Sequence, residues 1–199
     1  MGLHYYIIDT ETTGLKAGYH EITEISIIRC TDRHQLTKKI RASYPDRANA
    51  ISLEKTNRTM ADLLVGDDKM SVIQACNTFF AQDGVSSEDR CIVAHNSAFD
   101  KRFCHATWES AGLVFPANNW MDTIKFAKEW AKRVGNEPAN YQLATVLKFA
   151  NIKPMPGAHD AGSDARNTYL FWKKGMDMAQ NLGINHLQAI KREPHLTNV

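Results

Sequence analysis

The sequence carries almost no excess of charge of either sign. Its 199 residues hold 24 Lys and Arg against 22 Asp and Glu, a formal net charge of +2. The total charge therefore gives no indication of a nucleic-acid partner, and any basic surface has to be local. Hydrophobic residues make up 43% and charged residues 23%, which is typical of a folded globular protein with one substantial core.

Long apolar runs are also missing. No stretch approaches the roughly 20 residues that a helix needs to cross a bilayer. The N-terminus lacks the basic segment and the apolar stretch of a signal peptide, because an acid already arrives at Asp9. We therefore expect a soluble, cytoplasmic protein without a membrane partner.

Cysteines are few and show no metal-binding or disulfide pattern. The four cysteines include no C-x-x-C pair and have no histidine partners at zinc-finger spacing. Each of them lies in an apolar segment, so we expect reduced thiols in the core.

Repeats, low-complexity tracts and long linkers are absent as well, which favours one domain over residues 1–181 and a short polar tail at 182–199. Strands are predicted at 3–9, 21–31 and 35–44, and the short connection at 32–34 favours an antiparallel meander. The polar segment 45–67 predicts only loop and short helix. A short buried strand is predicted at 91–94.

Apolar periodicity predicts helices over most of the remaining chain. The first follows Asp68, and its apolar stripe consists of Val72, Ile73, Cys76, Phe79 and Phe80. Further helices are predicted at 98–111, at 123–134 with Val134 on the inward face, after a capping Asn140, and at about 161–181. Strands first, followed by helices around a further strand, indicate a mixed α/β sheet with helices on its faces.

What is present in the sequence is a set of acids at the ends of these elements. In "YYIIDTETTGL", Asp9 and Glu11 follow a buried strand and are two residues apart, so they project from the same face. Two close carboxylates repel each other, which a chain tolerates in solvent, by protonation, or by binding a cation such as Mg²⁺ or Mn²⁺. Taken alone, the pair is weak evidence for a metal, because acids two apart at the end of a strand are most often solvated turn residues.

Two further segments place acids near helix starts. In "IVAHNSAFDKRF", Asp100 lies early in a helix, where it could simply complement the helix dipole, and Asn96 could simply be a cap. In "GAHDAGSDARNTYLF", His159 and Asp164 are about 140° apart around a helix and would not share a face. The glycine-containing turns favour a loop for His159 and a helix start for Asp164. The alternative is a surface histidine beside an unrelated acid.

In combination and in this order, the three segments resemble the motifs of the DnaQ-like (DEDDh) 3′→5′ exonuclease family over about residues 5–175. Within that family, "IIDTETTGL", "VAHNSAFDKR" and the short segment between the last two motifs are most similar to the exonuclease X branch. One departure concerns the segment after the third strand, where Asn57-Arg58 stands in place of the Gly-Ile of many relatives. This departure leaves the shape of the substrate edge open.

The resemblance implies a ribonuclease H-like α/β fold, with a mixed five-stranded sheet flanked by helices. It also implies two Mg²⁺ (or Mn²⁺) ions held by Asp9, Glu11, Asp100 and Asp164, with Asp9 bridging both ions and Asp100 binding directly or through water. His159 would act as general base, a task that a neutral imidazole suits near pH 7. The product would be a nucleoside 5′-monophosphate.

The resemblance further implies contacts with the 3′ end of a nucleic acid. Backbone amides near Thr12 and Thr13 would hold the terminal nucleotide, Leu15 would wedge against the last base, and Asn96 and Phe99 would line the groove. For Leu15 and Phe99, ordinary core packing is the alternative.

Lys101 and Arg102 could touch phosphates or could be solvated helix charges. Single-stranded DNA or DNA 3′ overhangs are the expected substrate, favoured over RNA. A ribonuclease of the ribonuclease T or oligoribonuclease type, or a proofreading subunit, is the alternative. A polymerase partner is not expected, because the chain ends soon after its last helix. Relatives are often dimers, so a homodimer is allowed, although no apolar patch in the sequence indicates an interface.

Overall fold

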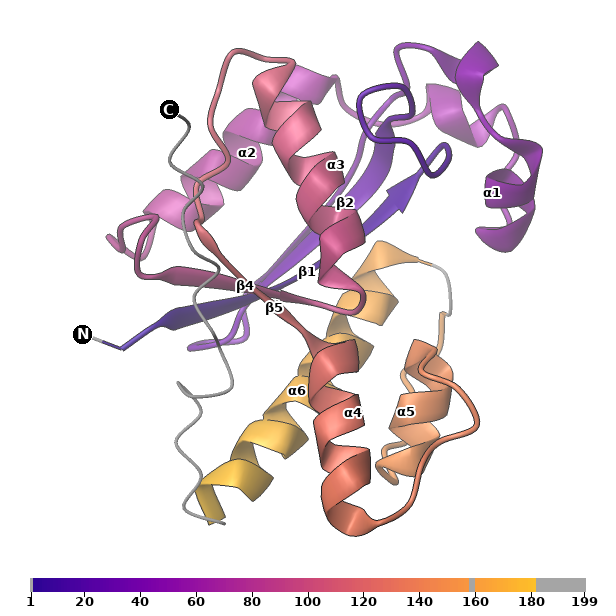
Figure 1. Ribbon diagram of the computed structural model, residues 1–199. Coiled ribbons are helices and arrows are strands. Elements are labelled where there is room, and N and C mark those ends of the chain that lie inside the picture. The colour runs from indigo at the N-terminus through magenta and orange to yellow at the C-terminus, as the bar shows by residue number, and fades with distance from the viewer. Residues whose placement is uncertain (1, 158–159, 182–199) are drawn as a thin grey trace, which may run out of the picture.

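The computed structural model describes residues 2–157 and 160–181, so the predicted tail at 182–199 lies outside the described residues (Figure 1). Five strands form one sheet: β1 (His4–Thr12), β2 (Ile22–Arg29), β3 (Gln35–Lys39), β4 (Arg90–Ala94) and β5 (Asn119–Asp122). The strand order is β3-β2-β1-β4-β5. Strand β1 is antiparallel to β2 and parallel to β4, which confirms the mixed five-stranded sheet.

Strands β1 and β3 end at other residues than predicted, because hydrogen bonding to neighbouring segments determines where each strand ends. Strand β1 continues past Asp9 to Thr12, because Thr12 still pairs with Ile22 on β2 after a register shift. Strand β3 ends at Lys39, five residues earlier than the predicted range, and Ala42 then bonds to the Leu63 carbonyl. The fifth strand had no predicted position. It is four half-buried residues, "NWMD", whose ends are polar.

The five long predicted helices are present with ends near those expected: α2 (Lys69–Ala81), α3 (Ser97–Glu109), α4 (Thr123–Val134), α5 (Leu143–Phe149) and α6 (Ala161–Asn181). The predicted loop and short helix at 45–67 contains η1 (Pro45–Arg47), α1 (Ala50–Lys55) and η2 (Asp62–Leu64). Two details of the helix predictions, the cap of α5 and the burial of Val134, are wrong. The N-cap of α5 is Gln142, whose amide bonds to the Asn140 side chain, and Val134 is 51% exposed because α4 ends there.

Helices cover both faces of the sheet, with α2 and α3 on one side and α6, backed by α4 and α5, on the other (Figure 1). Along β1, Tyr6 and Ile8 join the core under α2 and α3, whereas Ile7 packs with Ala165 of α6. The alternation of strand side chains therefore directs Asp9 and Glu11 toward α6.

The four cysteines are free thiols, three of them buried and Cys30 half-buried, as predicted. Within the described residues, no helix has the length and apolar character to cross a membrane.

Candidate active site

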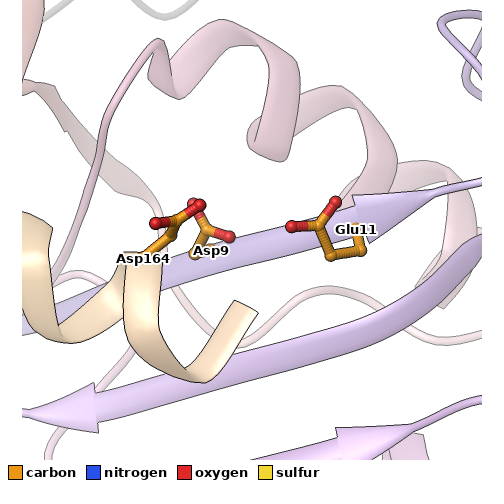
Figure 2. A group of neighbouring side chains, drawn as sticks. All are labelled: Asp9, Glu11 and Asp164. Atoms are coloured by element: carbon orange, nitrogen blue, oxygen red, sulfur yellow. The ribbon is translucent and has the colours of Figure 1, made fainter. Parts of the chain in front are cut away.

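Three of the four predicted metal ligands meet at the end of β1. Asp9 and Glu11 extend from the strand, and Asp164 reaches them from the first turn of α6 (Figure 2). One carboxylate oxygen from each lies within 4.8 Å of the others. Segments more than 150 residues apart in sequence thus converge on one site, as the family resemblance implied.

Asp100 stands beside this cluster and does not join it. It approaches from α3, on the opposite side of the sheet from α6, and is 4% exposed. The Thr10 hydroxyl donates a hydrogen bond of 2.8 Å to its Oδ1 atom. Asp100 does more than complement the dipole of α3, because its side chain is buried and its charge raises the pKa of Asp9.

Three acids of this region, Asp9, Glu11 and Asp100, have a raised pKa. Burial, followed by the charges of Asp100 and Glu11, raises the pKa of Asp9 well above its ordinary value. Burial also raises the pKa of Glu11 to about 8, although the nearby Arg58 guanidinium opposes part of that rise. For Asp100, burial raises the pKa to about 7, against the effect of the hydrogen bond from Thr10.

The donor set fits a hard divalent cation. Carboxylate oxygens are the ligands that Mg²⁺ and Mn²⁺ prefer, and a cation among Asp9, Glu11 and Asp164 would relieve the repulsion that raises the pKa of Asp9 and Glu11. Asp100 is close enough to contribute through its charge.

The predicted substrate-binding residues on the loop after β1 divide into two kinds. The Thr13 amide donates to the Glu21 carbonyl at 2.9 Å, so this one amide is already bonded, and the contact of amides near Thr12 and Thr13 with a nucleotide stays a prediction. The Thr12 hydroxyl likewise donates within the loop, to the Gly14 carbonyl at 2.7 Å. Leu15 is 71% exposed, which rejects core packing for this side chain and leaves it open to a wedge role.

The predicted residues around α3 are placed differently from one another. Asn96 precedes the helix with a left-handed backbone (φ 68°), and its exposed side chain makes no capping bond. Phe99 is half-buried and packs on Phe103 at 4.8 Å between ring centroids, so core packing accounts for part of its surface. Arg102 donates to the Ala98 carbonyl of its own helix, and Lys101 is half-buried. The predicted general base, His159, lies outside the described residues.

Two charged residues that the sequence did not indicate also belong to the neighbourhood. Glu24 on β2 is the direct strand partner of Glu11, and its carboxylate binds the guanidinium of Arg58. Arg58 and Asn57 line a cavity of about 420 Å³ together with Glu24. The departure at Asn57-Arg58 was the signal in the sequence. The strand pairing of Glu24 with Glu11, together with the ion pair between Arg58 and Glu24, shows that Arg58 lies near the acids.

Comparisons with known proteins agree with this geometry. A family model described as RNase_T, Exonuclease, matches residues 6–171. The chain is 31% identical over 172 residues to DNA polymerase III PolC-type of Listeria innocua, covering 85% of this chain and 11% of that protein. It is 25% identical over 186 residues to 3′-5′ exonuclease DinG of Staphylococcus haemolyticus, covering 94% and 19% respectively. The chain thus spans a small part of both relatives.

Among solved structures, E. coli Exonuclease I in complex with a dT13 oligonucleotide superposes with a TM-score of 0.75 at 15% identity, over 91% of this chain and 42% of that one. This likeness concerns the fold alone and confirms the ribonuclease H-like architecture. Since the family model covers most of the sequence, with the acid cluster inside it, the chain belongs to the exonuclease family that the model describes.

Proposed function

We propose that this chain is a metal-dependent 3′→5′ exonuclease that removes nucleotides from the 3′ end of single-stranded DNA or DNA overhangs. The observation that carries the proposal is the half-buried cluster of Asp9, Glu11 and Asp164 at the end of β1. The direction of digestion is supported by the relative named 3′-5′ exonuclease DinG. The choice of DNA is supported by the oligonucleotide bound to the structural neighbour and by the motif likeness to exonuclease X.

In this proposal, Asp9, Glu11 and Asp164, with Asp100 beside them, hold two Mg²⁺ or Mn²⁺ ions. Such ions, when bound, stabilise negative charge on the attacking and leaving oxygens at phosphorus. His159 accepts the proton of the attacking water. The bond to the 3′ oxygen of the penultimate nucleotide breaks, so the product is a nucleoside 5′-monophosphate. Thr10 holds Asp100 against β1 and keeps the acids in place.

Oligonucleotides of matched sequence in DNA and RNA, labelled at the 5′ end, test the proposal directly. With Mg²⁺, we expect progressive shortening from the 3′ end, faster on DNA, and none in chelator. Preferential shortening of RNA would favour a ribonuclease of the same family. Digestion from the 5′ end would contradict the proposal.

Variants connect this activity to the cluster. Loss of even an outer partner of a metal ligand typically costs about 10- to 100-fold, so Asp9→Asn and Asp164→Asn should each lower kcat by more than about 100-fold. Asp177→Asn changes an exposed acid on the same helix as Asp164 and should leave kcat unchanged. Retained turnover in Asp9→Asn or Asp164→Asn would reject the metal-dependent mechanism.

A second candidate is a proofreading module that acts within a polymerase assembly. The observation that favours it is the 31% identity to DNA polymerase III PolC-type. Co-purification of the chain with a polymerase from its own cells would support this role. A free-standing enzyme would instead digest oligonucleotides at the same rate with and without the polymerase.

A further inference from the structure

We infer that Tyr19, Tyr44 and Arg47, with Lys16 beside them, form an aromatic platform on which unpaired bases of the substrate strand stack. The inference rests on the proposed exonuclease function and deepens it, since it assigns the surface that binds the single strand next to its 3′ end. No motif of the resemblance includes these four residues.

The platform is a set of contacts between cationic groups and rings from two loops. The Arg47 guanidinium carbon lies 3.9 Å from the centroid of the Tyr44 ring and 5.2 Å from that of Tyr19. The Lys16 Nζ atom lies 5.8 Å from the Tyr19 centroid. Planar groups from residues 16–20 and 44–47 are thereby gathered in one place.

These rings do not serve the core. Tyr19 is 46% exposed and Tyr44 is 50% exposed, and neither belongs to the buried clusters or to the side chains packed against them. Leu15, in the same loop as Tyr19, is 71% exposed. A group of large apolar side chains in solvent, ordered by its own contacts, is typical of a binding surface.

The two cations of the platform, Lys16 and Arg47, lie against rings. Over residues 2–157 and 160–181, neither Lys16 nor Arg47 forms an ion pair with an acidic side chain. Two cationic side chains thus stand directly against exposed rings, a combination by which proteins bind single strands without reading their sequence.

Hydrogen bonds attach both loops of the platform to the end of β1. The Thr13 amide donates to the Glu21 carbonyl, and the Glu21 amide donates to the Thr13 hydroxyl, each at 2.9 Å. The Asn49 amide donates to the Thr13 carbonyl at 2.7 Å, and the Tyr44 amide to the Glu21 carboxylate at 2.8 Å. Thr13 follows Glu11 by two residues, roughly 7 Å of extended chain, so both loops are bonded to the chain just beyond the acid cluster.

Only an unpaired strand can use such a surface. In a duplex, each base is stacked between its neighbours and its faces are not available to a side chain, whereas a single strand offers both base faces and its phosphates. The occupant is therefore a stretch of nucleotides next to the scissile end.

Steady-state kinetics on two substrates test the platform. One is an oligothymidylate of about twelve nucleotides, long enough to cover a single-strand site. The other is the p-nitrophenyl ester of thymidine 5′-monophosphate, which reaches the acids but has no further bases. In the double variant Tyr19→Ala/Tyr44→Ala, we expect KM for the oligonucleotide to rise about fivefold or more, because the loss of even one stacked base weakens binding by about that factor. The kcat on both substrates and KM for the ester should stay unchanged.

The matched control is Tyr19→Phe/Tyr44→Phe, which keeps the rings and should keep the KM of the wild type. An unchanged oligonucleotide KM in the alanine variant would overturn the inference, and so would an equal rise in KM for the ester, since that would indicate a distorted active site. If the wild type cleaves neither substrate, the proposed function fails. The platform is then judged by oligonucleotide binding in chelator, where the same fivefold loss supports it and equal affinity rejects it.

Discussion

At the scale of single residues, Arg58 is a nearly buried cation that pairs with an acid next to the site. One Nη atom donates to the Thr23 hydroxyl at 2.7 Å, and the other binds the Glu24 carboxylate. Both side chains of this ion pair are nearly buried, 14% exposed for Arg58 and 6% for Glu24. Because Glu24 faces Glu11 across the strands, Arg58 compensates an acid that would otherwise add to the repulsion in the cluster.

Arg58→Met should therefore destabilise the protein strongly. Removing one partner of a buried ion pair leaves the other charge unpaired, which typically costs about 3–5 kcal/mol. We expect a loss near the lower end, about 3 kcal/mol, in urea unfolding with chelator present.

The double variant Glu24→Leu/Arg58→Met provides the control, because it removes both charges and leaves apolar side chains. Its stability should return to within about 1 kcal/mol of the wild type. If the double variant is as unstable as Arg58→Met, then packing rather than charge compensation explains the effect.

At the scale of elements, α6 determines where Asp164 lies. Its N-terminal half packs Ala165 on the sheet, and farther along Phe171 joins the cluster formed with α4 and α5. Gly175 lies against the Phe126 ring of α4, and a Cβ atom there would overlap that ring. The Phe126 ring packs against Phe171 and Trp130, whose ring centroids lie 5.6 Å and 6.2 Å from its own.

Gly175→Ala should lower the stability even though alanine is the better helix former. Alanine gains about 1 kcal/mol of helix propensity, whereas overpacking costs about 1–3 kcal/mol. The expected net loss of about 1 kcal/mol corresponds to a fall in Tm of roughly 2–4 °C.

Phe126→Leu makes room for the new methyl group and supplies the control. In that background, Gly175→Ala should raise Tm, since the propensity gain then stands alone. A fall of equal size in both backgrounds would show that Phe126 is not the obstacle.

The same scale shows what the sequence can and cannot predict. Helix α2 was predicted well because its apolar periodicity is strong and local, and the apolar run of β1 located that strand although not its end. Strand β5 had no predicted position because four half-buried residues carry little pattern. Three of the four acids that the motifs implied do meet, but the pairing of Glu24 with Arg58 depends on strand register and on a contact over 34 residues. Such non-local contacts leave no periodic signal.

At the scale of the whole molecule, the acid cluster makes stability depend on pH. Burial raises the pKa of Glu11 from 4.5 to about 8 and that of Asp100 from 3.8 to about 7. At any pH between the ordinary pKa of these acids and their raised pKa, the folded protein binds more protons than the unfolded chain. Unfolding then releases protons, so it becomes easier as the pH rises.

We therefore expect the protein in chelator to be most stable near the low end of this range, at about pH 5. Its free energy of unfolding should fall by about 2 kcal/mol or more as the pH rises toward about 8. Denaturant unfolding at a series of pH values measures this slope. Saturating Mg²⁺ should reduce it, because a cation that binds only the folded carboxylates restores stability most where they are ionised.

Glu11→Gln separates the cluster from the remaining acids of the chain. This variant lacks the group whose pKa is raised to about 8 and should show a shallower slope. At about pH 8 in chelator, it should be at least as stable as the wild type, since one source of repulsion is gone. Mg²⁺ should stabilise it less than the wild type, because one carboxylate of the cluster is missing. Identical slopes in the two proteins, or equal stabilisation by Mg²⁺, would mean that the repulsion among these acids does not control the stability of the fold.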